Sequence, residues 1–148
     1  MTLPDGETVA LRGFADRLEM TEDGAVVVVD FKTSKRQPTK DEVAEHPQLG
    51  LYQLAVEHGA VDHLVGEGAT PGGAELVMLR LPDKDMPKVQ HQEPHQAGPD
   101  GRRLIEVQLM TAAEVVRSEA ITAKENRYCG YCDFQNLCPV KGSGTVLS

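Results

Sequence analysis

The amino-acid sequence predicts an α/β fold, in which a mixed central sheet of about four strands is flanked by helices. Residues 25–32 contain four consecutive valines without apolar/polar alternation, which is typical of a strand covered on both faces. Two more strand-like segments occur at 75–81 and 86–92. The segments between and after these strands repeat apolar residues at helical spacing, so strands and helices are expected to share one core.

The first element is expected to be a β-hairpin. Residues 7–19 are predicted to form its first strand, and the turn at 21–24 contains an Asp-Gly pair, which is a strong hairpin signal. The valine-rich segment is then the second strand, because runs of β-branched residues disfavour helix and suit a pleated sheet.

Two short helices are expected after the hairpin. Thr39 is a suitable N-cap for a helix that starts at Lys40. Pro47 would interrupt that helix, and it fits the first turn of a second one. Apolar residues recur at helical spacing over 47–58, and Gly59 is expected to end this second helix.

The second half of the chain is expected to complete the sheet and to add a long helix. A glycine-rich loop at 66–73 precedes the strand at 75–81, and the shorter, more polar strand at 86–92 suits an edge position. Residues 93–101 are rich in Pro, Gly and His and predict a loop. Residues 104–123 have apolar positions at helical spacing and predict an amphipathic helix, after which come a cysteine-containing segment and a Gly/Ser tail.

The composition is that of a folded domain and argues against two classes of protein. The chain has 148 residues, of which 40% are hydrophobic and 26% charged, enough to bury a core. No apolar run approaches the ~18 residues of a membrane span and no signal peptide is present, so a cytoplasmic protein without a membrane partner is expected. The net charge of −8 argues against non-specific coating of nucleic acid.

Two acidic residues of the predicted hairpin are candidates for its chemistry. If the hairpin is centred near Asp23, the numbers of paired residues sum to about 46, which places Asp16 opposite Asp30 with their Cβ atoms roughly 5 Å apart. Lys32 is expected to project from the same face, because it lies two residues beyond Asp30. The rest of that face is apolar and is expected to include Phe14.

The combination of two carboxylates and a lysine predicts metal-assisted hydrolysis of a phosphodiester. Adjacent carboxylates repel one another unless a cation neutralises them, and Mg²⁺ often binds one or two carboxylates together with substrate phosphates. A nearby lysine can position or deprotonate an attacking water, or stabilise charge on a phosphate. The alternative is a simple ion pair between Asp30 and Lys32 at the strand end, with Asp16 solvated.

The segment after the second strand is basic. From Phe31 to Lys40 it contains four basic residues and no acidic one, as expected of a loop that follows a phosphate backbone, although a solvated loop has the same composition. On the next helix, Gln48 and Tyr52 are four residues apart and therefore share one face. Gln48 could hold a phosphate or a water, whereas Tyr52 could stack on a base or belong to the core.

Taken together, three segments resemble the successive motifs of the RecB-like nucleases, which belong to the PD-(D/E)XK superfamily. These segments are Gly-Phe-Ala-Asp-Arg-Leu-Glu at 13–19, Val-Asp-Phe-Lys-Thr at 29–33 and Gln-Leu-Gly-Leu-Tyr at 48–52. Their order and spacing match, and the resemblance covers about residues 8–140. It is nearest to the C-terminal nuclease domains of AddB- and AdnB-type bacterial helicase–nucleases, which process double-strand breaks.

The resemblance implies a restriction-endonuclease-like core over residues 1–126 and a cysteine segment with a tail over 127–148. It also implies cleavage of DNA, with Mg²⁺ or Mn²⁺ as cofactor. The DNA would be single-stranded ends, delivered by helicase motor domains of the same chain acting with a partner subunit. The alternative function is a non-catalytic module of the same fold that guides DNA or docks a subunit. The resemblance implies roles for the matching positions. Asp16, Asp30 and the backbone carbonyl of Phe31 would be metal ligands, Lys32 the catalytic lysine, and Gln48 and Tyr52 supporting residues. The basic composition of the loop, and not the resemblance, makes Lys35, Arg36 and Lys40 candidate DNA contacts.

One expected element of the family is missing from the sequence. RecB-like nucleases begin with a helix before the first strand, and this helix carries a His or Glu that completes the metal shell. Here the first strand is expected as early as residue 7. We therefore expect the sequence to be a fragment that lacks this helix.

Three cysteines form a C-x₂-C-x₅-C pattern at Cys129, Cys132 and Cys138. Without a signal peptide a disulfide framework is not expected, and three thiolates do not complete a Cys₄ cluster. The resemblance implies that they are the C-terminal part of a [4Fe–4S] site whose first cysteine lies upstream in the full-length parent. The alternatives are a zinc site completed by His91 or His95, or three free thiols.

Overall fold

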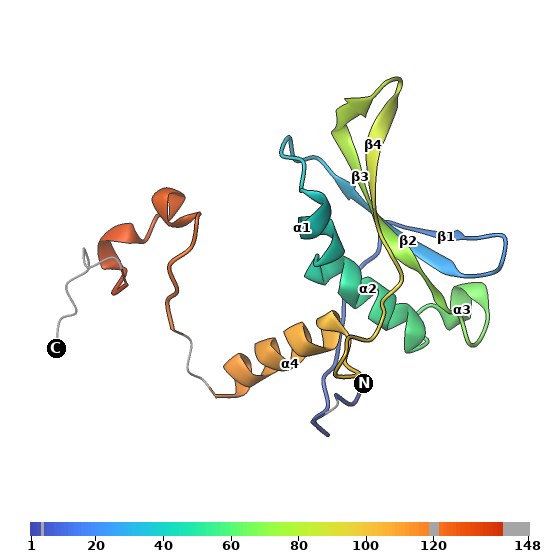
Figure 1. Ribbon diagram of the computed structural model, residues 1–148, viewed down its shortest axis with the longest axis horizontal. Coiled ribbons are helices and arrows are strands. Elements are labelled where there is room, and N and C mark those ends of the chain that lie inside the picture. The colour runs from blue at the N-terminus through green and yellow to red at the C-terminus, as the bar shows by residue number, and fades with distance from the viewer. Residues whose placement is uncertain (4, 119–121, 141–148) are drawn as a thin grey trace. The chain divides into compact units, whose positions relative to one another are not determined.

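The computed structural model describes residues 1–3, 5–118 and 122–140, and the chain divides into two compact units, Met1–Thr111 and Ala112–Ser148. The first unit contains one mixed four-stranded sheet with the strand order β1-β2-β3-β4 (Figure 1). Helices pack against this sheet, so the predicted α/β class with a mixed sheet of about four strands is confirmed.

The sheet combines two hairpins through one parallel pairing. β1 (Arg17–Met20) pairs antiparallel with β2 (Val26–Lys32), and β2 pairs parallel with β3 (Pro71–Asp83). β3 pairs antiparallel with β4 (Met86–Gln92), which lies at the edge of the sheet as predicted. The parallel pairing requires a long connection between β2 and β3, and this connection contains three helices.

The first two of these helices begin where the sequence predicts. α1 (Lys40–Ala44) starts with a capping box, in which the Thr39 side chain accepts from the Glu42 N–H while the Glu42 carboxylate accepts from the Thr39 N–H. α2 (Pro47–Glu57) has its proline in the first turn, where a missing N–H costs nothing. The capping box and the proline therefore set the starts of two helices that follow one another closely along the chain.

The core lies between α1, α2 and one face of the sheet. In β2 the residues from Val26 to Asp30 are all buried, which confirms that this strand is covered on both faces. The core cluster draws its buried side chains from both central strands and both helices: Val26, Val28, Val43, Leu49, Val56, Ala74, Leu76 and Met78. Asp30 is thus a carboxylate at the end of an otherwise apolar, buried strand.

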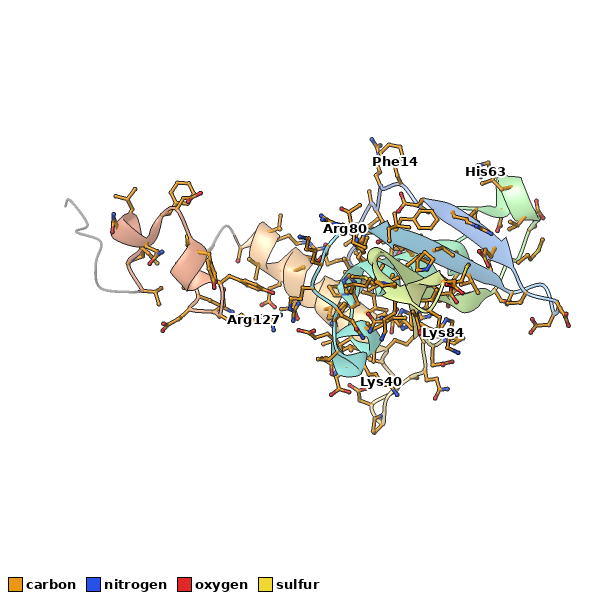
Figure 2. All side chains as sticks on the ribbon, turned by 90° about the horizontal axis from the view of Figure 1, so that it is seen from above. Phe14, Lys40, His63, Arg80, Lys84 and Arg127 are labelled. Carbon is orange, nitrogen blue, oxygen red and sulfur yellow. The ribbon has the colours of Figure 1, made fainter. Side chains whose placement is uncertain are left out.

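The prediction of a strand over 7–19 is wrong in its extent, because only Arg17–Met20 is paired in the sheet. Arg17 pairs with Val29, so the numbers of paired residues in this hairpin sum to 46. Residues before Phe14 would therefore need partners after Lys32, where β2 ends. Phe14 does not join the apolar face, since it is 95% exposed and projects outward from the segment before β1 (Figure 2).

Three further boundaries differ from the sequence prediction. A short helix, α3 (Asp62–Val65), was not expected, and β3 begins inside the predicted glycine loop and extends to Asp83. The last predicted helix is shorter, since α4 (Leu104–Arg117) ends well before residue 123. Residues 93–101 contain no helix or strand, as predicted, and the Gly/Ser tail lies outside the described residues.

α4 is attached to α2 through its first turn. Ile105 is buried, and a Cβ atom on Gly50 of α2 would come within 2.9 Å of the Ile105 Cδ1 atom. Only glycine permits this close approach, which explains a glycine inside a helix despite its low helix propensity. Arg103, just before α4, reinforces the contact through ion pairs with Glu57 of α2 and with Glu106.

The second unit is described to residue 140 and holds two single-turn 3₁₀ helices, Cys129–Tyr131 and Gln135–Leu137, around the cysteines. Among the described residues, no helix has the length and apolar character needed to cross a membrane.

Candidate active site

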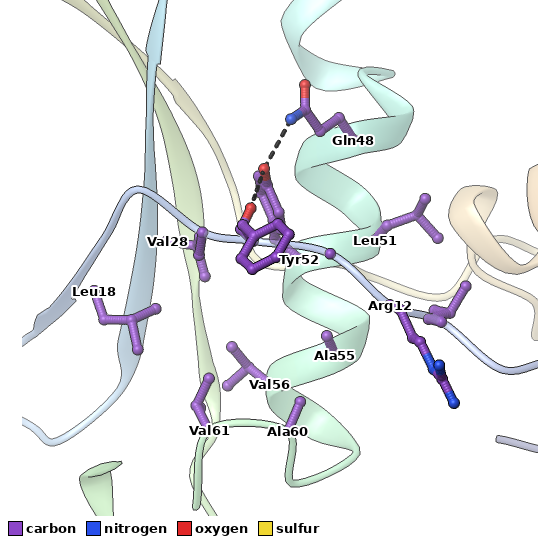
Figure 3. Close-up of a pocket in the computed structure, with 14 residues that line it drawn as sticks. Arg12, Leu18, Val28, Gln48, Leu51, Tyr52, Ala55, Val56, Ala60 and Val61 are labelled. Carbon is purple, nitrogen blue, oxygen red and sulfur yellow. Dashed lines mark hydrogen bonds between the residues drawn. The ribbon is translucent and has the colours of Figure 1, made fainter.

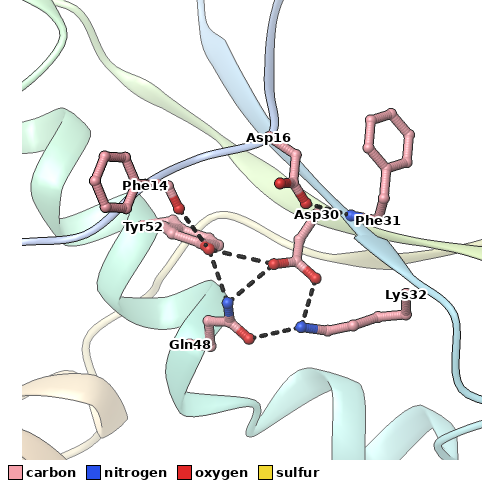
Figure 4. A network of polar contacts seen from close by, with 7 residues as sticks. All are labelled: Phe14, Asp16, Asp30, Phe31, Lys32, Gln48 and Tyr52. Carbon is pink, nitrogen blue, oxygen red and sulfur yellow. Dashed lines mark hydrogen bonds and ion pairs between the residues drawn. The ribbon is translucent and has the colours of Figure 1, made fainter.

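The β1–β2 hairpin brings the two predicted carboxylates together. Its register follows the sum of 46 that the Asp-Gly turn predicts, as in the pair Leu18 and Val28. Asp16 lies one residue before β1, and its Oδ2 atom accepts a hydrogen bond of 2.8 Å from the backbone N–H of Phe31 (Figure 4). The Asp16 carboxylate therefore contacts the peptide group that joins Asp30 to Phe31.

Asp30 is 3% exposed, and each of its oxygens has a different neighbour. Oδ1 accepts from Gln48 Nε2 at 2.9 Å and lies 3.2 Å from the Tyr52 hydroxyl. Oδ2 forms an ion pair with the Lys32 ammonium at 2.6 Å but takes part in no hydrogen bond of good geometry with the described residues. A buried carboxylate needs such partners, because the desolvation of an isolated charge is costly.

Gln48 connects the lysine to the carboxylate. Its Oε1 accepts from Lys32 Nζ at 2.9 Å, and its Nε2 donates to both Asp30 and the Tyr52 hydroxyl, the latter at 2.7 Å. This arrangement fixes the orientation of the amide, because Lys32 can only donate and Asp30 only accept. The shared helical face predicted for Gln48 and Tyr52 is therefore confirmed, and both point at Asp30 (Figure 4).

Tyr52 also connects the site to the segment before the hairpin. Its hydroxyl lies 3.0 Å from the backbone carbonyl oxygen of Phe14 and can donate its one proton to this oxygen or to Asp30. Burial raises the pKa of Tyr52, and the charge of Asp30 raises it further, so the hydroxyl keeps its proton at neutral pH. Phe14 thus contributes its backbone instead of the apolar side chain that the sequence suggested.

The basic loop is only partly available for a ligand. Arg36 forms an ion pair of 2.6 Å with Glu42, whereas Lys35 and Lys40 are exposed and have no ion pair with the described residues. Gln90 of β4 donates a hydrogen bond of 2.8 Å to the Pro38 carbonyl, so the loop lies against the edge strand.

Sequence reasoning missed His46, the N-cap of α2. Burial lowers the pKa of His46, Lys32 lowers it further, and Asp30 opposes this effect, so the imidazole lies within electrostatic reach of the site. Its Nδ1 atom is buried and has no hydrogen-bond partner among the described residues. A single histidine before a proline has no distinctive pattern, so nothing in the sequence indicates this position.

Sequence reasoning also missed a pair of buried glutamines that hold the corner between α1 and α2. Gln92 of β4 donates from Nε2 to the carbonyl of Val43 at 2.8 Å and contacts the carbonyls of Ala44 and His46. Gln53 of α2 donates to the Gln92 side-chain oxygen at 2.9 Å. These bonds fix the start of α2, on which Gln48 lies. Gln53 stands out in the sequence as an amide among apolar helix residues, whereas Gln92 lies in a polar strand and no pattern indicates it.

A groove of about 660 Å³ lies beside the polar network, between α2 and the segment before β1 (Figure 3). Gln48 and Tyr52 belong to both features, so the groove is continuous with the candidate site. Residues 11–15 of the segment before β1 form one wall, which includes the charged Arg12. The rest of the lining is aliphatic and comes from α2, the hairpin and the segment after α2: Leu18, Val28, Leu51, Ala55, Val56, Ala60 and Val61.

The site supplies some, but not all, of the oxygen ligands that a divalent cation needs. Asp16 and Asp30 supply carboxylate oxygens, and Asp30 Oδ2 is a buried oxygen without a hydrogen-bond donor other than the neighbouring ammonium. No group of three His, Cys, Asp or Glu side chains suited to a metal occurs in the described part of the chain. A cation at this site would need further oxygens, as Mg²⁺ commonly takes from backbone carbonyls, waters and substrate phosphates.

The three cysteines lie in the second unit and form no disulfide with one another. Cys129 accepts a hydrogen bond of 3.2 Å from the Asn126 N–H, and Cys132 is exposed. The two histidines considered as a fourth ligand have other partners in the first unit. His95 Nε2 lies 3.1 Å from the carbonyl of Gly50, and His91 Nδ1 lies 3.5 Å from the Glu75 carboxylate.

Comparison with known proteins agrees with this geometry. The model of the PD-(D/E)XK nuclease superfamily matches residues 2–139, which include both strands of the hairpin, the helix with Gln48 and Tyr52, and the cysteine segment. No curated protein matches the chain.

Proposed function

The chain belongs to the PD-(D/E)XK nuclease superfamily, and from this premise we propose that its first unit is a Mg²⁺- or Mn²⁺-dependent deoxyribonuclease domain that hydrolyses phosphodiester bonds. One observation carries the proposal: a buried carboxylate, Asp30, is held by Lys32 and Gln48 in a closed polar network beside a second carboxylate, Asp16. A structural ion pair alone does not require the second carboxylate or the amide that bridges lysine and aspartate.

The residues have distinct roles in this proposal. Asp16, Asp30 and the backbone carbonyl of Phe31 would hold the cation. When bound, the cation would neutralise the carboxylates and polarise a phosphate oxygen. Lys32 would orient the attacking water or stabilise the charge that develops on the phosphate as one P–O bond forms and another breaks. Gln48 would keep the Lys32 ammonium in place.

We further propose that the substrate is a single DNA strand, cut as part of double-strand-break processing. The apolar groove beside Tyr52 supports a single strand, because it offers space for an unstacked nucleoside next to the phosphate at Asp30. Lys35, Arg36 and Lys40 would contact the backbone, although Arg36 must first leave Glu42. In the full-length protein, helicase motor domains acting with a partner subunit would deliver the strand, as in RecB-like AddB- and AdnB-type enzymes. The three cysteines would join a [4Fe–4S] cluster there.

The test is cleavage of a labelled single-stranded oligonucleotide with Mg²⁺ or Mn²⁺ by the chain and its Asp30→Asn variant. We expect the variant to lose cleavage by about 1,000-fold, because one metal-binding oxygen is replaced by an amide. Asp23→Asn, an isosteric change in the turn of the same hairpin, is the matched control and should cleave normally. Equal rates for the wild-type chain and Asp30→Asn would refute the assignment.

The second candidate function is a non-catalytic module of the same fold that guides DNA or docks a subunit. It is favoured by the lack of a group of three metal-ligating side chains in the described part of the chain. Titration of Mn²⁺ distinguishes the two functions. A nuclease should show a saturable site that weakens in Asp16→Asn and Asp30→Asn, whereas a scaffold should show none.

A further inference from the structure

The β3–β4 hairpin brings a cation to the candidate site that is remote from it in the sequence. Lys32 of β2 is in register with Met78 of β3, and Met78 is in register with Lys88 of β4. Residues paired directly across a sheet project from the same face. Met78 is buried in the core against the helices, so Lys88 lies on the face that also carries Lys32.

The side chains that follow Lys88 on this face confirm its direction. Gln90 donates to the Pro38 carbonyl of the basic loop, and Gln92 donates to carbonyls at the end of α1. Lys88 is two residues before Gln90, so their Cα atoms are about 7 Å apart along the strand. Lys88 therefore lies at the edge of the sheet, beside the loop that carries Lys35 and leads into α1 at Lys40.

The electrostatic setting leaves Lys88 available for a ligand. It is half-buried and forms no ion pair with the described residues, unlike Arg36, which is paired with Glu42. The acidic residues of its own hairpin are at the tip, where Asp83 ends β3 and Asp85 lies in the turn. An unpaired ammonium partly held by its surroundings loses less conformational freedom on binding a phosphate than a fully exposed one.

We infer that Lys88 is a phosphate contact for the DNA strand, a few nucleotides from the bond that is cut; this inference rests on the proposed nuclease function. Two strand spacings separate Lys32 from Lys88, or about 10 Å between their Cα atoms. Lys35 comes from the loop that follows Lys32, and Lys40 is the first residue of α1 at the end of this loop. Together the four lysines form a cationic path from the carboxylates to the edge strand, in a chain whose net charge is −8.

The experiment measures binding of a fluorescein-labelled single-stranded oligonucleotide to the 148-residue chain in EDTA, where no cleavage takes place. Affinity is measured at several salt concentrations for wild type, Lys88→Gln, Lys88→Arg and Lys84→Gln. Lys84 lies in the turn at the tip of the same hairpin, so its replacement changes the net charge equally and serves as the matched control (Figure 2).

We expect Lys88→Gln to weaken binding at low salt several-fold. The slope of log K against log salt should decrease in magnitude by about 0.7, the value for one phosphate contact on a single strand. Lys88→Arg should retain the wild-type slope, and Lys84→Gln should change it little. An unchanged slope for Lys88→Gln, an equal loss in Lys84→Gln, or no binding by the wild-type chain would each overturn the inference.

The nuclease proposal is tested by cleavage and the Lys88 contact by binding, so either can fail without the other. If Asp30→Asn cleaves normally while Lys88→Gln loses its phosphate contact, the catalytic assignment is wrong and the contact stands. If Asp30→Asn loses cleavage while Lys88→Gln keeps the wild-type slope, the catalytic assignment stands and the phosphate contact of Lys88 is refuted. Thermal unfolding of each variant establishes that its fold is intact.

Discussion

At the scale of single residues, Gln48 decides how the candidate site is organised. A side-chain amide has an acceptor oxygen and two N–H donors, and here the oxygen accepts from Lys32 while the two N–H groups donate to Asp30 and Tyr52. Glutamate at this position would repel Asp30, and an aliphatic side chain would leave buried polar groups without partners. The Gln48 amide therefore holds Lys32 and the buried Asp30 carboxylate next to one another and satisfies a hydrogen bond of each.

Tyr52→Phe tests the contribution of this network to function. The substitution removes the hydroxyl near both Asp30 and the Phe14 carbonyl but leaves the ring in place. A hydrogen bond to a charged group is worth about 1.5–3 kcal/mol, so we expect the rate of cleavage to fall by roughly tenfold or more. Single-turnover cleavage at saturating enzyme measures this effect.

The control for this prediction is Tyr131→Phe in the second unit, whose ring is highly exposed. It should cleave at the wild-type rate. A Tyr52→Phe variant that also cleaves at the wild-type rate would show that Asp30 does not depend on the hydroxyl.

The sequence predicts local relations between residues better than tertiary ones. The Asp-Gly turn sets the hairpin register and hence the position of Asp16, and helical spacing places Gln48 and Tyr52 on one face. The exposure of Phe14, by contrast, depends on the tertiary fold. The position of Lys88 requires the order and register of β2, β3 and β4, which no local pattern contains.

At the scale of elements, the corner between α1 and α2 determines where Gln48 lies. Gln92 of β4 contacts three backbone carbonyls at this corner, including that of His46, and so replaces partners that a helix end otherwise lacks. The N-terminus of α2 is less well satisfied, since the His46 side chain makes no cap hydrogen bond. This end of α2 is therefore a weak point next to the site.

His46→Asn should stabilise the protein and flatten its pH dependence. Asparagine is a good N-cap, worth about 1 kcal/mol at neutral pH. In the folded wild type the pKa of His46 is lowered, mainly by burial, so the unfolded chain takes up a proton first as pH falls below about 6.5. The free energy of unfolding of the wild type therefore decreases as the pH falls from neutral to the lowered pKa of His46. His46→Asn has no imidazole at this position, so its free energy of unfolding should not show this decrease.

Urea unfolding of both proteins between pH 5 and pH 7.5 checks the sign. His63→Asn removes an exposed histidine from α3 and is the matched control, which should retain the wild-type slope of stability against pH. A slope that is the same in His46→Asn and wild type would contradict the prediction.

The bounds of elements with strong local sequence signals can be predicted. The lengths of strands, which depend on the neighbouring strands that pair with them, cannot. The capping box and Pro47 fix the starts of α1 and α2. The first strand is shorter than its composition suggests, because β2 ends at Lys32 and offers no partner to earlier residues. β3 is longer than expected because it continues beyond β2 and pairs with β4 alone, and α3 is a single turn that periodicity does not detect.

At the scale of the whole molecule, net charge and local charge lead to different conclusions. A charge of −8 opposes non-specific binding along DNA, yet the proposed DNA path would run from Lys32 to Lys88, two lysines that are in register across the sheet through Met78. Two of the acidic residues are the proposed metal ligands, whose charge a bound cation would offset. The bulk value therefore does not argue against a nuclease.

The distribution of buried residues shows which part of the chain the fold requires. Every buried hydrophobic side chain in the described part lies between Leu3 and Ile105, within the first unit. From Ala112 to Ser118 the described side chains are mostly exposed, and none of the cysteines is buried. The core thus draws nothing from the described residues of the second unit.

A chain shortened after Ser118 should therefore fold and unfold like the complete one. It retains the sheet, α1, α2 and the whole of α4, including the contact of Ile105 with α2. We expect the midpoint of thermal unfolding to change by less than about 4 °C, which corresponds to about 1 kcal/mol for a domain of this size. The matched comparison is a chain shortened after Leu104, which loses Ile105 and should unfold at a clearly lower temperature, because burial of an isoleucine contributes about 2–3 kcal/mol. If both shortened chains lose the same stability, the cysteine segment contributes to the fold and the boundary lies elsewhere.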